Sequence, residues 1–172
     1  MGLLLPGDDP SEHARQHGHA HLPVAPADNG GAGADAATSG VLTEIDHVGM
    51  AVRDLDTTVD WYRTTFGATV SHRERIETDG VEEALIKVAD SYLQLLTPYT
   101  DTSPLAKYME RNGEGIHHVG YRVADCSAVL EQVKQTGARV VDEHPRTGSR
   151  GTTVAFLHPK SSFGSLIELV EE

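Results

Sequence analysis

The sequence is poor in cysteine and positive charge, and each shortage narrows the possible functions. Its 172 residues include one cysteine, Cys126, which cannot form a disulfide within the chain and indicates a reducing compartment. Fourteen Lys and Arg residues stand against 26 Asp and Glu, which gives a formal net charge of -12. We do not expect such an acidic chain to have nucleic acid or an anionic membrane as its main partner. Small-molecule chemistry is left open.

Long apolar runs are also missing. No stretch reaches the roughly 18 apolar residues that are needed to cross a bilayer. The N-terminal stretch MGLLLPGDDP lacks the basic start of a signal peptide. We therefore predict a cytoplasmic protein without a membrane partner.

Residues 1–43 differ in composition from the rest of the chain. They are rich in Gly, Ala, Asp and Pro, and their few large apolar residues follow neither a helical nor a strand period. Such a segment buries too little surface to offset the entropy of ordering it, so we predict a disordered tail. The tail contains the stretch HARQHGHAH, for which adventitious metal binding and a merely polar character are both open.

A regular succession of strand-like and helix-like segments begins at Glu44. Asp54 has the character of a helix N-cap and Gly67 that of a helix stop, with apolar residues at helical spacing between them. Asp125 and Gly137 frame a second helix in the same way. We predict strands at residues 45–52, 68–71, 83–88, 92–97, 116–123, 139–142, 152–157 and 166–170.

The second half of the chain repeats the first. Residues 45–49 read IDHVG and residues 116–120 read IHHVG, and each central histidine stands seven positions before its helix cap. An internal repeat of this kind indicates two βαβββ modules, and hence an α+β fold. The predicted division is a tail at 1–43 and a domain at 44–172, with modules at about 44–98 and 115–172 and a connector at 99–114 that contains a short helix.

Polar residues occupy matching places late in each module. Gln94 interrupts an apolar strand 47 residues after His47, and Glu168 interrupts another 50 residues after His118. A carboxylate in a buried strand is unfavourable unless a cation or hydrogen bonds compensate its charge. These four residues therefore form a candidate site for Co, Mn, Ni, Fe or Zn. His118 is preferred to His117, because adjacent side chains of a strand face opposite ways and His118 aligns with His47.

Together these features resemble the vicinal oxygen chelate superfamily, which includes glyoxalases, bleomycin-resistance proteins and dioxygenases. Within it, residues 44–172 resemble the methylmalonyl-CoA epimerases. The resemblance is carried by the stretches IDHVGMAVRDLDTTVDWYRTTFG, GVEEALIKV, SYLQLL, SPLAKYMERNGEGIHHVGYRV, DEHPRTGSRG and FLHPKSSFGSLIELV. It implies a curved mixed-sheet cup around a metal. The family's four ligands match the set His47, Gln94, His118 and Glu168.

The resemblance also implies an activity. It predicts interconversion of (R)- and (S)-2-methylmalonyl-CoA in propionate metabolism, by removal of the C2 proton through a metal-stabilised enolate. The family's catalytic glutamate matches Glu83 rather than its neighbour Glu82, and Glu168 is the candidate for the acid/base group on the opposite face. One divalent ion is expected, Co2+ before Mn2+, Ni2+, Zn2+ or Mg2+, together with an acyl-CoA substrate and a homodimer.

A glycine-bearing loop is a weaker candidate for substrate binding. Ser149 and Arg150 offer hydroxyl and guanidinium donors for a carboxylate or for the phosphates of CoA, and Lys160 lies in a similar turn. Ordinary solvated loops would contain the same residue types. Two other functions also stay open: another metal-dependent enzyme of this fold, such as a glyoxalase-type lyase or an extradiol dioxygenase, and a non-catalytic small-molecule-binding protein.

Overall fold

A computed structural model describes residues 40–172. The tail predicted at residues 1–43, with its histidine-rich stretch, lies outside the described residues except for 40–43. No helix within the described range is long and apolar enough to span a membrane.

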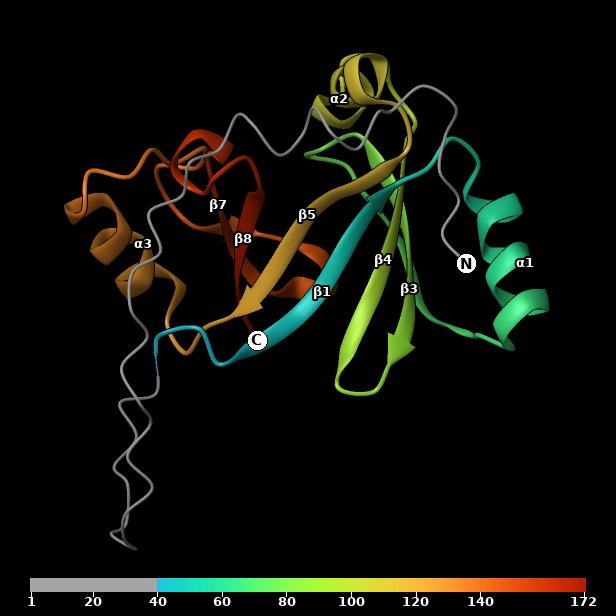
Figure 1. Ribbon diagram of the computed structural model, residues 1–172, viewed down its shortest axis with the longest axis horizontal. Coiled ribbons are helices and arrows are strands. Elements are labelled where there is room, and N and C mark those ends of the chain that lie inside the picture. The colour runs from blue at the N-terminus through green and yellow to red at the C-terminus, as the bar shows by residue number, and fades with distance from the viewer. Residues whose placement is uncertain (1–39) are drawn as a thin grey trace, which may run out of the picture. The chain divides into compact units, whose positions relative to one another are not determined.

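One mixed sheet of eight strands forms the described part, in the order β2-β3-β4-β1-β5-β8-β7-β6. The central pair, β1 and β5, is antiparallel, whereas β1 pairs in parallel with β4 and β5 in parallel with β8. Figure 1 shows β1 and β5 side by side between the two halves of the sheet. The strands are β1 (Glu44–Ala51), β2 (Val70–Ile76), β3 (Val81–Val88), β4 (Ser91–Pro98), β5 (Gly115–Arg122), β6 (Arg146–Thr147), β7 (Thr153–Leu157) and β8 (Leu166–Glu171).

Three α-helices accompany the sheet: α1 (Leu55–Phe66), α2 (Pro104–Asn112) and α3 (Cys126–Gln135). Asp54 and Asp125 cap α1 and α3, each accepting a backbone N–H of the first turn at 2.8 Å. Gly67 ends α1 in the left-handed region at φ 68°, which a residue with a side chain adopts less readily. Two short 3-10 helices, η2 (Ser149–Gly151) and η3 (Pro159–Ser161), flank β7.

Each of the two modules has its own apolar core, and the two cores are built in the same way. In the first, Leu55 of α1 is buried in one apolar cluster with Ala84, Ile86 and Leu95 of β3 and β4. In the second, residues of α3 are buried against β7 and β8 in an equivalent cluster: Cys126, Val129, Leu130, Ala155 and Leu169. Figure 1 shows α1 and α3 on the outside of their respective halves. This leaves the opposite face of the sheet free for polar residues.

The predicted α+β fold of two βαβββ repeats is confirmed, with two differences at the edges of the sheet. The first edge strand, β2, extends to Ile76 instead of ending at residue 71, because the sequence SHRER is polar on both faces and shows no apolar alternation. The strand predicted at 139–142 is wrong, and the edge strand β6 lies instead at Arg146–Thr147, in the predicted glycine-bearing loop. Val140 forms one isolated bridge with Leu157, and the N–H of Phe156 donates to the Asp142 side chain at 2.9 Å. The Asp142 carboxylate thus accepts the Phe156 N–H, which a longer β-ladder would pair with a backbone carbonyl.

Candidate active site

Strand register brings the four predicted metal ligands onto two adjacent rows of one face. In the first row, Gln94 pairs with Gly49, which pairs with His118. The second row runs from His47 to Gly120 and on to Glu168. Register partners point to the same face of a sheet. Each row therefore carries two of the predicted ligands, one on each side of a glycine.

The glycines provide the space for the histidine rings. A Cβ built on Gly49 would lie 2.2 Å from His118 Cε1, and one on Gly120 would lie 2.4 Å from His47 Cε1. Each ring therefore lies over the glycine of the other repeat. This reciprocal packing explains why both copies of the repeated sequence hold a histidine and a glycine two positions apart.

Polar atoms of three of these side chains, those of His47, His118 and Glu168, converge on one point. His47 Nε2 lies 2.9 Å from His118 Nε2 and 2.8 Å from Glu168 Oε2, and His118 Nε2 lies 3.1 Å from the same oxygen. All four residues are at least 94% buried, since none exceeds 6% exposure. Among the described residues, Gln94 Oε1 has no hydrogen-bond partner. Two imidazole nitrogens, one carboxylate oxygen and a buried unpaired amide oxygen are a donor set that suits a divalent metal.

The pKa shifts of His47 and Glu168 also fit a site for a divalent cation. Burial disfavours the charged ring of His47, but the carboxylates of Asp46 and Glu168 outweigh this and raise its pKa to about 9. Burial likewise opposes the charge of Glu168, yet contacts with His118 and His47 lower its pKa to about 2. A divalent cation at this point would compete with a proton on His47 for the buried carboxylate.

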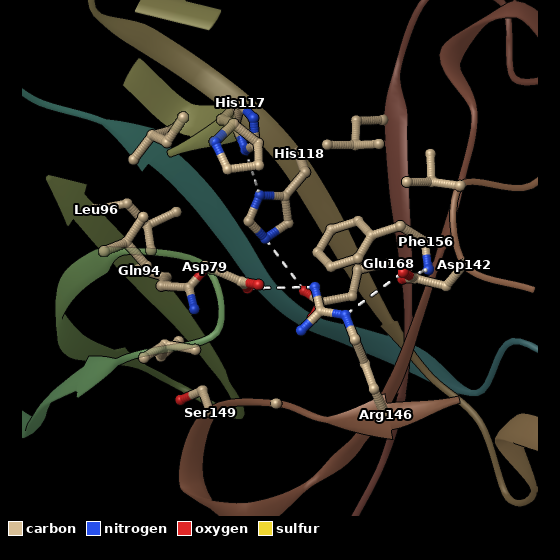
Figure 2. A pocket seen from close by; sticks show the side chains of 17 residues that line it. Asp79, Gln94, Leu96, His117, His118, Asp142, Arg146, Ser149, Phe156 and Glu168 are labelled. Carbon is tan, nitrogen blue, oxygen red and sulfur yellow. Dashed lines mark hydrogen bonds and ion pairs between the residues drawn. The ribbon is translucent and has the colours of Figure 1, made fainter. Parts of the chain in front are cut away.

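Two β-bulges place a polar neighbour beside each histidine. The register of β1 and β5 skips Asp46 on one strand and His117 on the other. Asp46 Oδ1 accepts from His47 Nδ1 at 2.8 Å, and His117 Nδ1 lies 2.9 Å from His118 Nδ1. Such contacts orient a ligating imidazole. Simple alternation fails here, so His117 does not turn to the opposite face and lines the pocket beside His118, as Figure 2 shows.

Asp46 is a residue that the sequence reasoning missed. It is fully buried, and besides His47 it binds Arg122 at 2.7 Å and Arg150 at 3.0 Å. Burial alone would raise its pKa, but the hydrogen bonds from His47 and the two arginines hold it well below its usual range. Its position before His47, equivalent to that of His117 before His118, was the signal that could have identified it.

Glu83 and Glu82 face opposite sides of β3. Glu83 is 0% exposed, accepts from Gln94 Nε2 at 2.6 Å and also accepts from the Ser149 hydroxyl. Burial raises the pKa of Glu83, against the lowering effect of these two hydrogen bonds. Glu82 binds Arg73 and Arg75 on the outer face, at 2.9 and 3.1 Å. Of these two glutamates, only Glu83 therefore shares the face of the predicted metal ligands.

A pocket of about 300 Å³ opens over this site. Its lining includes the polar residues Gln94, His118, Ser149 and Glu168 and several apolar side chains: Ile76, Val81, Leu96, Leu105 and Phe156. A ligand with a polar part and an apolar part can find partners for both among these residues.

Only one of the three predicted substrate-binding residues lines the pocket. Ser149 lines the pocket, whereas Arg150 binds Asp46 and Lys160 is exposed on η3. Arg146, the other arginine of the predicted glycine-bearing loop, lines the pocket instead, with its guanidinium 3.2 Å from Asp79 and 3.5 Å from Asp142 (Figure 2). The two arginines of one loop were not distinguishable by sequence, because their partners are distant in the chain.

Comparison with known proteins agrees with this geometry. Residues 46–156 match the Glyoxalase/Bleomycin resistance protein/Dioxygenase superfamily. The ethylmalonyl-CoA/methylmalonyl-CoA epimerase of Cereibacter sphaeroides is 37% identical over 131 residues, which cover 75% of this chain and 98% of that protein.

Solved structures give the same result. Methylmalonyl-CoA epimerase in complex with methylmalonyl-CoA and NH4+ is 45% identical with a TM-score of 0.74, covering 76% of this chain and 95% of that one. The Mycobacterium tuberculosis methylmalonyl-CoA epimerase is 37% identical with a TM-score of 0.74, covering 78% and 91%.

A curved sheet of two βαβββ repeats, with two histidines and a glutamate converging between them as a candidate site for a divalent metal, defines the class of this protein. The chain belongs to the Glyoxalase/Bleomycin resistance protein/Dioxygenase superfamily. Within it, the chain belongs to the family of the methylmalonyl-CoA epimerases.

Proposed function

We propose that this chain is an epimerase that interconverts (R)- and (S)-2-methylmalonyl-CoA. The observation that carries the proposal is the placement of the buried Glu83 on the same face as the convergent set His47, His118 and Glu168. Relatives named for this activity, one of them solved with methylmalonyl-CoA, support the substrate class. A CoA thioester is therefore the expected partner of the pocket.

His47, Gln94, His118 and Glu168 would hold one divalent ion. When bound, the ion would stabilise the negative charge that develops, mainly on the thioester oxygen, as the C2 proton is removed. Gln94 is neutral, so the set contributes a single negative charge and preserves much of the ion's attraction for an anionic substrate. Co2+ is the favoured ion, with Mn2+, Ni2+, Zn2+ and Mg2+ as alternatives.

Glu83 would act as one acid/base group. Its raised pKa suits a carboxyl that must alternately accept and release a proton. Gln94 and Ser149 hold its two oxygens, so the carboxyl is fixed between two residues that line the pocket. Glu168 is our candidate on the opposite face, in addition to its role as a ligand. Ser149 would contact the substrate, and Arg150 and Lys160 remain weaker candidates.

The remaining parts of the prediction are also proposals. We expect a homodimer in the cytoplasm, with residues 1–43 forming a tail and residues 44–172 the catalytic domain.

Turnover by matched variants tests the proposed activity. The metal-loaded protein is supplied with one epimer, and the other is removed by a stereospecific mutase that reports its formation. We expect Glu83→Gln to lower kcat by about 10²- to 10⁴-fold, the usual contribution of a general acid or base. Glu82→Gln, the same change one residue away on the outer face, should stay near wild type. Equal activity of both variants would remove Glu83 from the mechanism.

A further inference from the structure

The protein partners of Glu83 leave few routes for a proton. Its carboxylate is fully buried and is held by the Gln94 amide and the Ser149 hydroxyl. The amide group donates its N–H and does not accept a proton under ordinary conditions. The Ser149 hydroxyl could pass a proton on, but Ser149 lines the pocket that the substrate would fill during turnover. A proton on Glu83 therefore needs another route to water.

The proposed reaction makes such a route necessary. When an epimerase uses two acid/base groups, one group takes a proton from C2 and the other gives a proton on the opposite face. After product release, the group that began without a proton therefore carries one, and the group that began with a proton has lost it. The enzyme must restore both protonation states before it can convert a second molecule in the same direction.

β2 places a suitable pair of residues beside Glu83. Glu74 is the register partner of Glu83, and His72 lies two residues before Glu74 on the same face. A ring nitrogen of His72 and carboxylate oxygens of Glu74 and Glu83 all lie within 4.8 Å of one another. A single water molecule can bridge groups at such a separation.

The same pair reaches solvent. The His72 side chain is 37% exposed although its Nε2 atom is buried, in contrast to the 0% exposure of Glu83. His72 Nε2 lies 2.9 Å from Glu74 Oε1, which also accepts the backbone N–H of Arg150 at 2.7 Å. Glu74 is therefore fixed and can stabilise a positive charge on the imidazole.

We propose that His72, oriented by Glu74, carries protons between the buried Glu83 carboxyl and solvent. The proposal rests on the proposed epimerase function. The proton leaves the Glu83 carboxyl for a ring nitrogen of His72, which gives a carboxylate and an imidazolium beside Glu74. The imidazolium then releases a proton to water and returns to the neutral ring. The same steps run in reverse when turnover leaves Glu83 without its proton.

Steady-state kinetics of His72→Gln in the metal-loaded full chain test this role. At low substrate the enzyme has time to restore its protonation states between turnovers, so kcat/KM should stay within about twofold of wild type. At saturating substrate the proton return limits the rate, so kcat should fall by about tenfold or more. Added imidazole should restore part of kcat. His144→Gln, the same change at an exposed histidine, should alter neither parameter.

The two kinetic parameters distinguish a proton relay from a purely structural role of His72. Equal losses in kcat and kcat/KM would mean that His72 merely shapes the site, and an unchanged kcat would mean that protons travel elsewhere; either result overturns the relay. If His72→Gln does not fold, Glu74→Gln should give the same selective loss of kcat, and its absence overturns the relay too. A fully metallated wild-type protein without epimerase activity would instead refute the proposed function.

Discussion

The His118 ring lies directly over Gly49, so close that a Cβ there would be 2.2 Å from the ring. Gly49→Ala should therefore displace the imidazole from the point where it meets His47 and Glu168. We expect metal affinity to fall by about tenfold or more, the order found when ligand orientation is lost. Metal content after dialysis measures the effect. Gly40→Ala, at a glycine with open space around it, is the control. Full metal retention by Gly49→Ala would contradict the packing argument.

Asp46→Asn should weaken both stability and metal binding. The substitution keeps the shape of the side chain but removes the charge that faces Arg122, Arg150 and His47. Breaking a buried ion pair on one side costs about 3 kcal/mol or more, and we expect a loss of this order in urea denaturation.

The matched control for Asp46 is Asp60→Asn. Asp60 pairs with Arg63 at 3.0 Å on the surface of α1, with both side chains more than 60% exposed. Such a pair contributes about 1 kcal/mol or less. Similar losses of unfolding free energy in the two variants would show that the buried network around Asp46 stabilises the fold no more than a surface ion pair does.

Metal removal should destabilise the protein and abolish turnover together. Without an ion, two imidazole nitrogens and a carboxylate oxygen crowd within about 3 Å of one another, and an ion at 100 times its Kd would add about 2.7 kcal/mol. We expect chelation to lower Tm and added Co2+ to restore it. Glu168→Gln, which lacks the ligand charge, should show a much smaller response to Co2+. A Tm that is indifferent to chelator in the wild type would count against a metal site.

The Cys126 thiol should be unreactive, and its raised pKa should lower the folding stability of the protein at alkaline pH. The residue is fully buried, and burial, with nearby carboxylates such as Glu171, raises the pKa of its thiol to about 11 from 9.0. The unfolded chain therefore loses this proton at lower pH than the folded chain does. Stability should fall between pH 9 and 11 by more in wild type than in Cys126→Ala. Parallel stability curves would show that the thiol does not contribute.

The placement of the four candidate ligands on one face could be predicted because the repeat makes two distant pairs equivalent. His47 and His118 occupy the same place in each copy, and Gln94 and Glu168 are polar residues in otherwise apolar strands at nearly equal spacings. The strand register then brings these four onto two adjacent rows. Local periodicity likewise predicted the helices, whose caps at Asp54 and Asp125 are confirmed.

The parts that were missed depend on irregular backbone or on distant contacts. The bulges at Asp46 and His117 break strand alternation, and alternation was the rule used to assign facing sides. Arg150 meets Asp46 across a separation of 104 residues, which no local pattern reveals. Asp142 replaces a ladder hydrogen bond of β7 with its side chain, so an apparently good strand sequence at 139–142 forms only a bridge.

The most direct test of the proposed epimerase chemistry is proton exchange at C2. Metal-loaded protein is incubated with one epimer of 2-methylmalonyl-CoA in D2O, and deuterium entry is followed by mass spectrometry together with the stereochemistry of the product. We predict deuterium at C2 of the inverted epimer, with loss of the reaction on chelation and in Glu83→Gln but not in Glu82→Gln. Absence of exchange in a fully metallated wild-type protein would contradict this mechanism.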